Sequence, residues 1–131
     1  YFNTERVCIE GQNEFYKPQN IKEVSKIIRE YVKGKTEGID LSAPAGSTIV
    51  AAERGTVAAI TADVDQVPIV VIKHANELLT VYANVGNISV SKGAQVSRGQ
   101  AIGKIPSNNP TYLHFEVRQG LESVDPLDYL R

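Results

Sequence analysis

The fold is decided by the stretch Leu113-His114-Phe115-Glu116-Val117-Arg118, in which apolar and polar residues alternate. Its apolar set is Leu113, Phe115 and Val117, and its polar set is His114, Glu116 and Arg118. Successive side chains of a β-strand point to opposite faces of the sheet. We therefore predict a strand over His114–Arg118 whose apolar set faces the core. The polar set then shares the other face, where His114 is either a metal ligand or a solvated side chain.

Further short apolar runs, separated by glycine and polar turns, fill the chain between Lys35 and this strand. We predict six strands in this region, at Thr48–Ala52, Thr56–Thr61, Ile69–Lys73, Leu79–Tyr82, Ile88–Val90 and Ala101–Ile105. Strands with this spacing favour an antiparallel sheet or sandwich over a parallel β-α-β arrangement. The fold is therefore expected to be mainly β.

One amphipathic helix is predicted ahead of the strands, over Ile21–Val32. Apolar residues recur there with the helical period, Asn20 can cap the start and Gly34 can end the helix. The helix divides the chain into an N-terminal extension, residues 1–35, and a β domain, residues 36–131. It either packs on the core or lies over a groove or a partner.

The composition is that of a single globular domain. The chain has 131 residues, of which 42% are apolar and 22% charged, and its net charge is −1. Binding to nucleic acid or to an anionic membrane is disfavoured because the chain has no basic block. No apolar run approaches the about 20 residues that cross a bilayer. The chain begins at Tyr1, so we expect a fragment of a longer, exported protein.

Asp40 and His114 are the residues that could carry metal chemistry. Asp40 lies at the mouth of a turn, where an aspartate either binds a metal or stabilises the turn. The segment Lys92–Gly103 raises a second possible function. Its two glycine turns on either side of a single valine also occur in biotinyl- and lipoyl-carrier domains. Those domains usually present their lysine between methionines. The chain has no methionine, so a carrier role is disfavoured.

Several motifs taken together resemble the LytM/lysostaphin-type zinc metallopeptidases. They follow the family's order across Thr36–Arg131 and include Gly38-Ile39-Asp40-Leu41-Ser42-Ala43-Pro44-Ala45-Gly46, Thr80-Val81-Tyr82-Ala83, Leu113-His114-Phe115-Glu116-Val117-Arg118 and Val124-Asp125-Pro126-Leu127-Asp128-Tyr129-Leu130. The resemblance implies an antiparallel β-sheet or sandwich of the LytM type. It also implies that Asp40 and His114 are remnants of a metal site.

The resemblance further implies that the zinc site and the catalytic histidines are lost. Active members bind zinc through two histidines and an aspartate and use two more histidines on water and substrate. Asp40 and His114 keep two of these positions, whereas Thr36, Tyr112 and Asn84 replace three histidines. Catalytic zinc needs three protein ligands, so we expect no bound zinc and no catalysis. The remnant metal positions are Thr36, Asp40 and His114, and the groove positions expected to bind a partner are Asn84, Tyr112 and Glu116.

The expected function is that of the degenerate EnvC- and NlpD-type members, which activate cell-wall amidases during bacterial cell division. The partner is then an amidase, peptidoglycan or both, and the location is the periplasm or cell envelope. One departure is Asp65-Gln66-Val67-Pro68, which replaces the family's glycine-rich loop beside the groove. The alternative is a zinc-dependent peptidoglycan endopeptidase that borrows a third ligand from Glu37, His74 or a partner.

Overall fold

The computed structural model describes residues 27–107 and 111–128. The strands are β1 (Ile27–Arg29), β2 (Ile39–Ser42), β3 (Thr48–Val50), β4 (Gly55–Ala62), β5 (Pro68–Lys73), β6 (Leu78–Ala83), β7 (Gln95–Val96), β8 (Ala101–Lys104), β9 (Tyr112–Gln119) and β10 (Glu122–Val124). Two short 3-10 helices, η2 (Ala75–Glu77) and η3 (Pro126–Asp128), complete these elements. No helix within the described ranges has the length and apolar character needed to cross a membrane.

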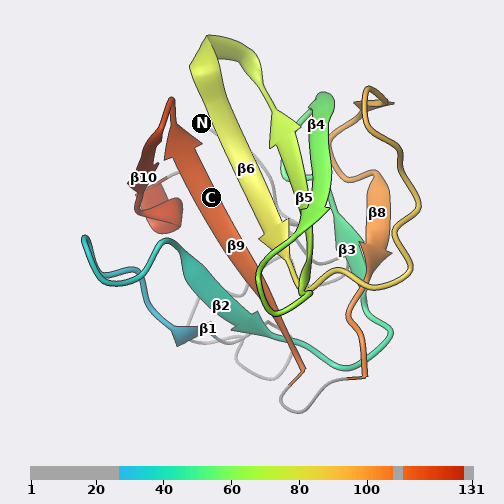
Figure 1. The fold of residues 1–131 in the computed structure, drawn as a ribbon, viewed down its shortest axis with the longest axis horizontal. Coiled ribbons are helices and arrows are strands. Elements are labelled where there is room, and N and C mark those ends of the chain that lie inside the picture. The colour runs from blue at the N-terminus through green and yellow to red at the C-terminus, as the bar shows by residue number, and fades with distance from the viewer. Residues whose placement is uncertain (1–26, 108–110, 129–131) are drawn as a thin grey trace.

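Most strands join one antiparallel sheet. Its order is β1-β2-β9-β6-β5-β4-β7, and β10 pairs with β9 outside this path. The strands β3 and β8 form a second, two-stranded sheet. Figure 1 shows β9 and β6 in the middle of the large sheet and the small sheet beside its β4 end. The predicted mainly β, antiparallel fold is confirmed.

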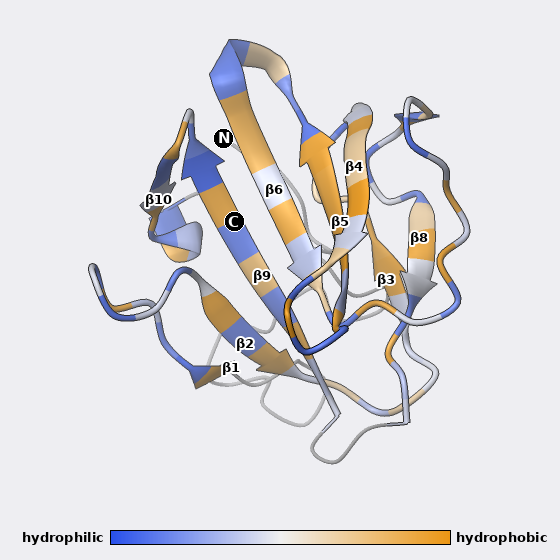
Figure 2. Ribbon diagram, viewed as in Figure 1, coloured by the Kyte–Doolittle hydropathy of each residue, from blue (hydrophilic) through white to orange (hydrophobic). Residues whose placement is uncertain are grey.

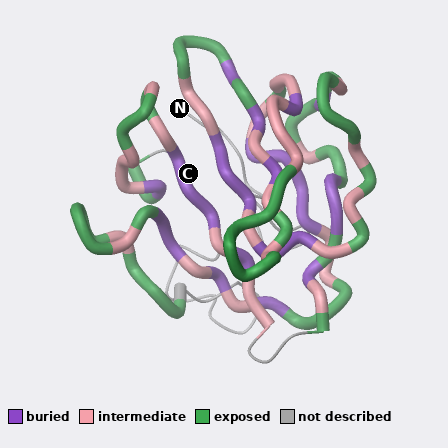
Figure 3. Tube along the Cα trace, in the orientation of Figure 1, coloured by how far each residue is buried: buried purple, intermediate pink, exposed green. Residues whose placement is uncertain are grey.

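The core lies against one face of the large sheet. The apolar set of β9 faces it, because Leu113, Phe115 and Val117 are all 0% exposed. The Phe115 ring packs on that of Tyr82 in β6, with 5.5 Å between the ring centroids. Figure 2 shows hydrophilic and hydrophobic residues alternating along β9, and Figure 3 shows that β9 and β6 are largely buried. The predicted alternation along β9 is therefore confirmed.

The prediction of a helix over Ile21–Val32 is wrong for the part of this segment that the structure describes. Residues 21–26 lie outside the described residues, and Ile27–Arg29 forms β1. This strand runs antiparallel to β2, with Arg29 opposite Asp40. β-Branched isoleucines suit a strand as well as a helix, so pairing with β2 overrides the helical period. The domain boundary after residue 35 stays a prediction.

The other strand predictions agree in place and differ mainly in their ends. Ile88–Val90 is the exception, since it forms no strand. Ser89 instead donates its backbone N–H to the Ile102 carbonyl at 3.0 Å. The strands β2, β7 and β10 were not predicted because two to four residues are too few to show a period.

Candidate functional site

The site is built on the middle strands of the large sheet. Asp40 of β2 is opposite His114 of β9, and His114 is opposite Ala83 of β6. Opposed residues of antiparallel strands project to the same face, here the face away from the core. Asp40 Oδ1 lies 2.6 Å from His114 Nδ1. The two metal-site remnants inferred from the sequence are thus brought together.

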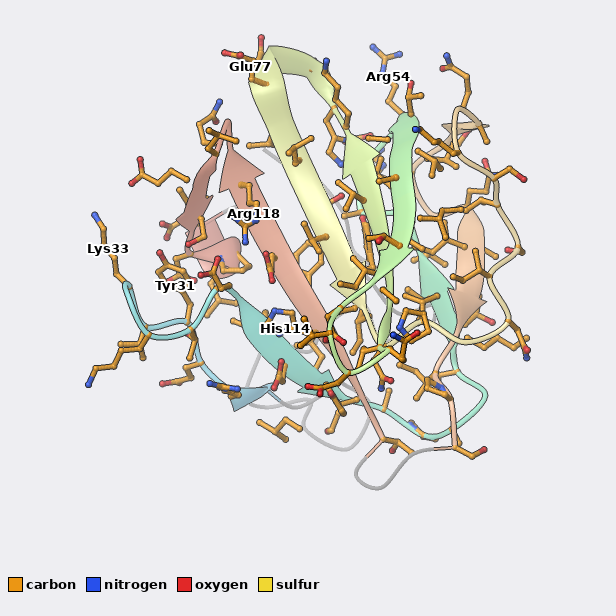
Figure 4. The ribbon with its side chains drawn as sticks, viewed as in Figure 1. Tyr31, Lys33, Arg54, Glu77, His114 and Arg118 are labelled. Carbon is orange, nitrogen blue, oxygen red and sulfur yellow. The ribbon has the colours of Figure 1, made fainter. Side chains whose placement is uncertain are left out.

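A second carboxylate holds the other ring nitrogen of His114. Glu116 Oε2 lies 2.8 Å from His114 Nε2. Glu116 Oε1 accepts a hydrogen bond from Arg118 Nε at 2.9 Å, and Arg118 Nη2 donates to Glu37 Oε2 at 2.6 Å. We call Glu37, Asp40, His114, Glu116 and Arg118 the charged ladder. Figure 4 labels His114 and Arg118, which lie along β9.

The charged ladder makes His114 a cation at neutral pH. The side chains of Asp40, His114 and Glu116 are 15%, 22% and 11% exposed. Burial alone would lower the pKa of His114, but its hydrogen bonds to Asp40 and Glu116 and their charges raise that pKa to about 9. Burial alone would raise the pKa of Glu116, but His114 and then Arg118 lower it. An imidazolium ring therefore sits between two carboxylates.

The two histidines of the chain are expected to titrate far apart. His114 should have a pKa of about 9. Burial lowers the pKa of His74, against the opposing effects of its hydrogen bond to the Arg54 carbonyl and of the Glu53 charge. An NMR titration of the imidazole protons between about pH 5 and pH 10 measures both values.

Because the chain has only two histidines, a His114→Gln variant assigns both signals. A pKa for His114 near its ordinary value of about 6.5 would contradict the ion-paired geometry.

Thr36 takes no part in the charged ladder. Its hydroxyl accepts a hydrogen bond from the Val32 N–H and donates one to the Glu30 carbonyl at 3.0 Å. These bonds close the turn around Gly34, whose φ is +80°. Thr36 therefore stabilises the connection between β1 and β2, and its assignment to the family's first zinc-histidine position stays a prediction.

Asn84 and Tyr112 are brought together through the backbone of β9. Asn84 is buried, and its Nδ2 donates to the Tyr112 carbonyl at 2.9 Å. Its φ of +75° is a left-handed conformation that asparagine adopts more readily than most residues. Tyr112 is half-buried opposite Ser42, at the end of β9 beside His114. The side chain of Asn84 thus anchors the chain after β6 to the end of β9.

His74 lies apart from the charged ladder, in a buried polar chain. Its Nδ1 is 2.7 Å from the Arg54 carbonyl and its Nε2 is 2.7 Å from Thr80 Oγ1. The Thr80 hydroxyl is in turn hydrogen-bonded to the Tyr82 hydroxyl at 2.9 Å. Both ring nitrogens of His74 are therefore used inside the fold.

In the charged ladder, Asp40 and His114 contact each other directly, at 2.6 Å, rather than through a metal ion. Zinc binds the lone pair of a neutral imidazole, whereas both ring nitrogens of His114 face carboxylate oxygens. A metal ion at this position would have to displace the proton that Asp40 and Glu116 stabilise on His114. Among residues 27–107 and 111–128, no group of three or more His, Cys, Asp or Glu side chains could hold a metal.

An apolar surface continues from the charged ladder across the same face. Val81 is opposite Glu116, Val71 is opposite Val81, and Ala59 is opposite Val71. Val81 is 9% exposed, and Ile69, Val71 and Ala59 are half-buried. We call Ala59, Ile69, Val71 and Val81 the apolar flank. The sequence reasoning missed it, although the unbroken run Ile69-Val70-Val71-Ile72 signals a strand that is apolar on both faces.

An antiparallel sheet that carries an Asp–His pair on the face away from the core is the architecture of a LytM-type domain, and the relatives reported below show that it is a degenerate one near the NlpD type. The chain belongs to peptidase family M23, whose family model matches residues 34–126. Sequence relatives include the uncharacterized lipoprotein YgeR of Escherichia coli, 34% identical over 80% of this chain and 44% of the relative. The murein hydrolase activator NlpD of Salmonella typhimurium is 36% identical over 75% of this chain and 27% of the relative. The chain thus spans less than half of the length of these relatives.

Solved structures share the fold. Csd3 of Helicobacter pylori matches with a TM-score of 0.72 and 32% identity, over 82% of this chain and 32% of that chain. The catalytic domain of the prophage-encoded M23 protein EnpA from Enterococcus faecalis, solved as a point mutant, matches with a TM-score of 0.67 and 27% identity. That match covers 81% of this chain and 90% of the EnpA chain. The predicted LytM-type architecture is therefore confirmed.

Proposed function

We propose that this chain is a non-catalytic LytM module that binds and activates a cell-wall amidase during cell division or peptidoglycan remodelling. The observation that carries the proposal is the state of His114, whose two ring nitrogens are both held by carboxylates. A protonated imidazole offers no lone pair to a metal and cannot act as a base. The outer face is then a surface for binding rather than for hydrolysis.

The relatives support a role in the cell envelope. Those of the NlpD type are named murein hydrolase activators, and YgeR is named a lipoprotein. We infer that this chain acts in the periplasm or elsewhere in the envelope, with an amidase, peptidoglycan or both as its partner. Neither nucleic acid nor a membrane is assigned to it as a partner.

A dye-release assay on purified, dye-labelled cell wall tests the proposal. The protein alone is expected to release no dye, because it lacks a zinc centre and a catalytic base. A candidate amidase mixed with the protein is expected to release more dye than the amidase alone. Dye released by the protein alone would contradict the proposal and favour the endopeptidase.

The endopeptidase alternative also makes a metal prediction, which serves as the control. Glu37 is paired with Arg118, and both ring nitrogens of His74 are used inside the fold, so neither is a ready third ligand. After zinc soaking, native mass spectrometry is expected to find less than one zinc per chain. A stoichiometric zinc that is lost in His114→Ala would support the endopeptidase instead.

A further inference from the structure

The turn between β4 and β5 is held largely by the side chain of one residue, Asp63. Asp63 Oδ1 accepts hydrogen bonds from the backbone N–H groups of Asp65 at 2.8 Å and Val67 at 3.0 Å. The Asp63 N–H donates to the Val67 carbonyl at 3.1 Å, and the Gln66 N–H donates to the Asp63 carbonyl at 3.0 Å. We call residues 63–67 the aspartate turn. Four hydrogen bonds within five residues fix its shape.

The aspartate turn presents an apolar side chain to solvent. Val64 is 94% exposed at its tip. A single exposed valine is ordinary in itself, but this one is held on a turn with a fixed backbone. A residue held in this way loses little conformational entropy when a partner covers it, so more of its burial energy appears as affinity.

The negative charges on either side of Val64 indicate the kind of partner that it could bind. Its neighbours Asp63 and Asp65 are both acidic, and neither forms an ion pair with a described lysine or arginine. A carboxylate-bearing cell-wall peptide would be repelled here. A protein surface with an apolar pocket and a rim of lysine or arginine would be attracted.

The aspartate turn stands at the end of the face that carries the candidate site. The strands β4 and β5 lead into the turn, and Thr61 of β4 is opposite Ile69 of β5. Ile69 is opposite Ala83 of β6, which is in turn opposite His114 of β9. Adjacent strands are about 4.8 Å apart, so β5 is about 10 Å from β9. Figure 1 shows the turn at the end of the sheet where β6 ends. The turn therefore lies at the end of this face where Ile69 of the apolar flank and His114 of the charged ladder are placed.

We propose that Val64, with Asp63 and Asp65 beside it, inserts into an apolar pocket with a basic rim on the amidase. The inference rests on the proposed function, because it specifies the partner chemistry that the amidase must offer. Val64 supplies the buried apolar contact, and the two carboxylates supply attraction and orientation. The apolar flank and charged ladder form the rest of the contact surface.

Binding of a candidate amidase, measured by surface plasmon resonance with the whole chain, tests this inference. Val64→Ser is expected to weaken binding about tenfold to a hundredfold, because a buried valine contact is lost. Leu121→Ser is the matched control, since Leu121 is 97% exposed at the tip of the β9–β10 hairpin. This variant is expected to bind like the wild type. Asp65→Lys is expected to slow association, with the largest effect at low salt.

Each outcome separates the two proposals. Equal affinity of wild type and Val64→Ser, with the wild type bound to the amidase, overturns the docking role of Val64 alone. An equal loss in Leu121→Ser overturns it as well. Failure of the wild type to bind or activate any amidase tested overturns both proposals. Loss of cell-wall sedimentation in Val64→Ser, with amidase binding unchanged, shows that the turn contacts peptidoglycan and overturns the assigned partner.

Discussion

His114→Ala is expected to lower the free energy of unfolding by about 3 kcal/mol near pH 6. The variant leaves the carboxylates of Asp40 and Glu116, which are 15% and 11% exposed, without the cation between them. The rise of the His114 pKa from 6.5 to about 9 corresponds to a stabilisation of about this size. Urea unfolding followed by circular dichroism measures the loss.

The pH dependence of this loss provides its control. The pKa of His114 is higher in the folded than in the unfolded chain, so its contribution is complete below about pH 6.5 and disappears as the pH rises through about 9. The wild type should lose stability across this window, and His114→Ala should lose much less. The lowered pKa of His74 acts below this window. Parallel stability curves for the two proteins would contradict the role of the charged ladder.

Gly38→Ala is expected to cost about 3 kcal/mol or more, or to prevent folding. A Cβ atom at Gly38 would lie 2.2 Å from the Phe115 carbonyl oxygen and 2.8 Å from Glu116 Cγ. The strands β2 and β9 would have to separate, which also breaks the Asp40–His114 pair between them. The glycine of the Gly-Ile-Asp motif thus leaves room for the side chain of Glu116. Thermal unfolding of the variant measures the effect.

Gly46→Ala is the matched control for this steric argument. Gly46 has a φ of +85°, and a Cβ built there meets nothing within 4 Å. Its replacement should cost only the strain of a left-handed alanine, about 1 kcal/mol. A Gly38→Ala variant that is no less stable than Gly46→Ala would show that β2 and β9 are not held as closely as described.

The sequence predicted the parts of the structure that depend on local alternation. Apolar and polar residues alternate along β9, so Leu113 and Phe115 face the core, whereas His114 and Glu116 lie together on the other face. That spacing was enough to predict a shared face. It was not enough to predict a hydrogen bond to each nitrogen of His114, because the Asp40 contact also depends on the register of β2 against β9.

Non-local pairing explains what the sequence did not predict. Isoleucines with a helical period form β1 because β2 offers a strand edge to pair with. Arg118 reaches Glu37 across 81 positions of the chain, a contact that no local pattern encodes. Thr36 was placed with the metal site by family position, whereas its hydroxyl closes the five-residue turn from Val32 to Thr36. Whether Thr36, Asn84 and Tyr112 contact a partner stays a prediction.

The imidazolium of His114 has a consequence for where such a domain can work. In a metalloenzyme, the positive charge opposite the aspartate arrives from solution and can be removed by a chelator. Here the charge that Asp40 faces is carried by the polypeptide itself. Under the proposed non-catalytic role, assembly of this sheet would therefore not depend on the local supply of transition metals.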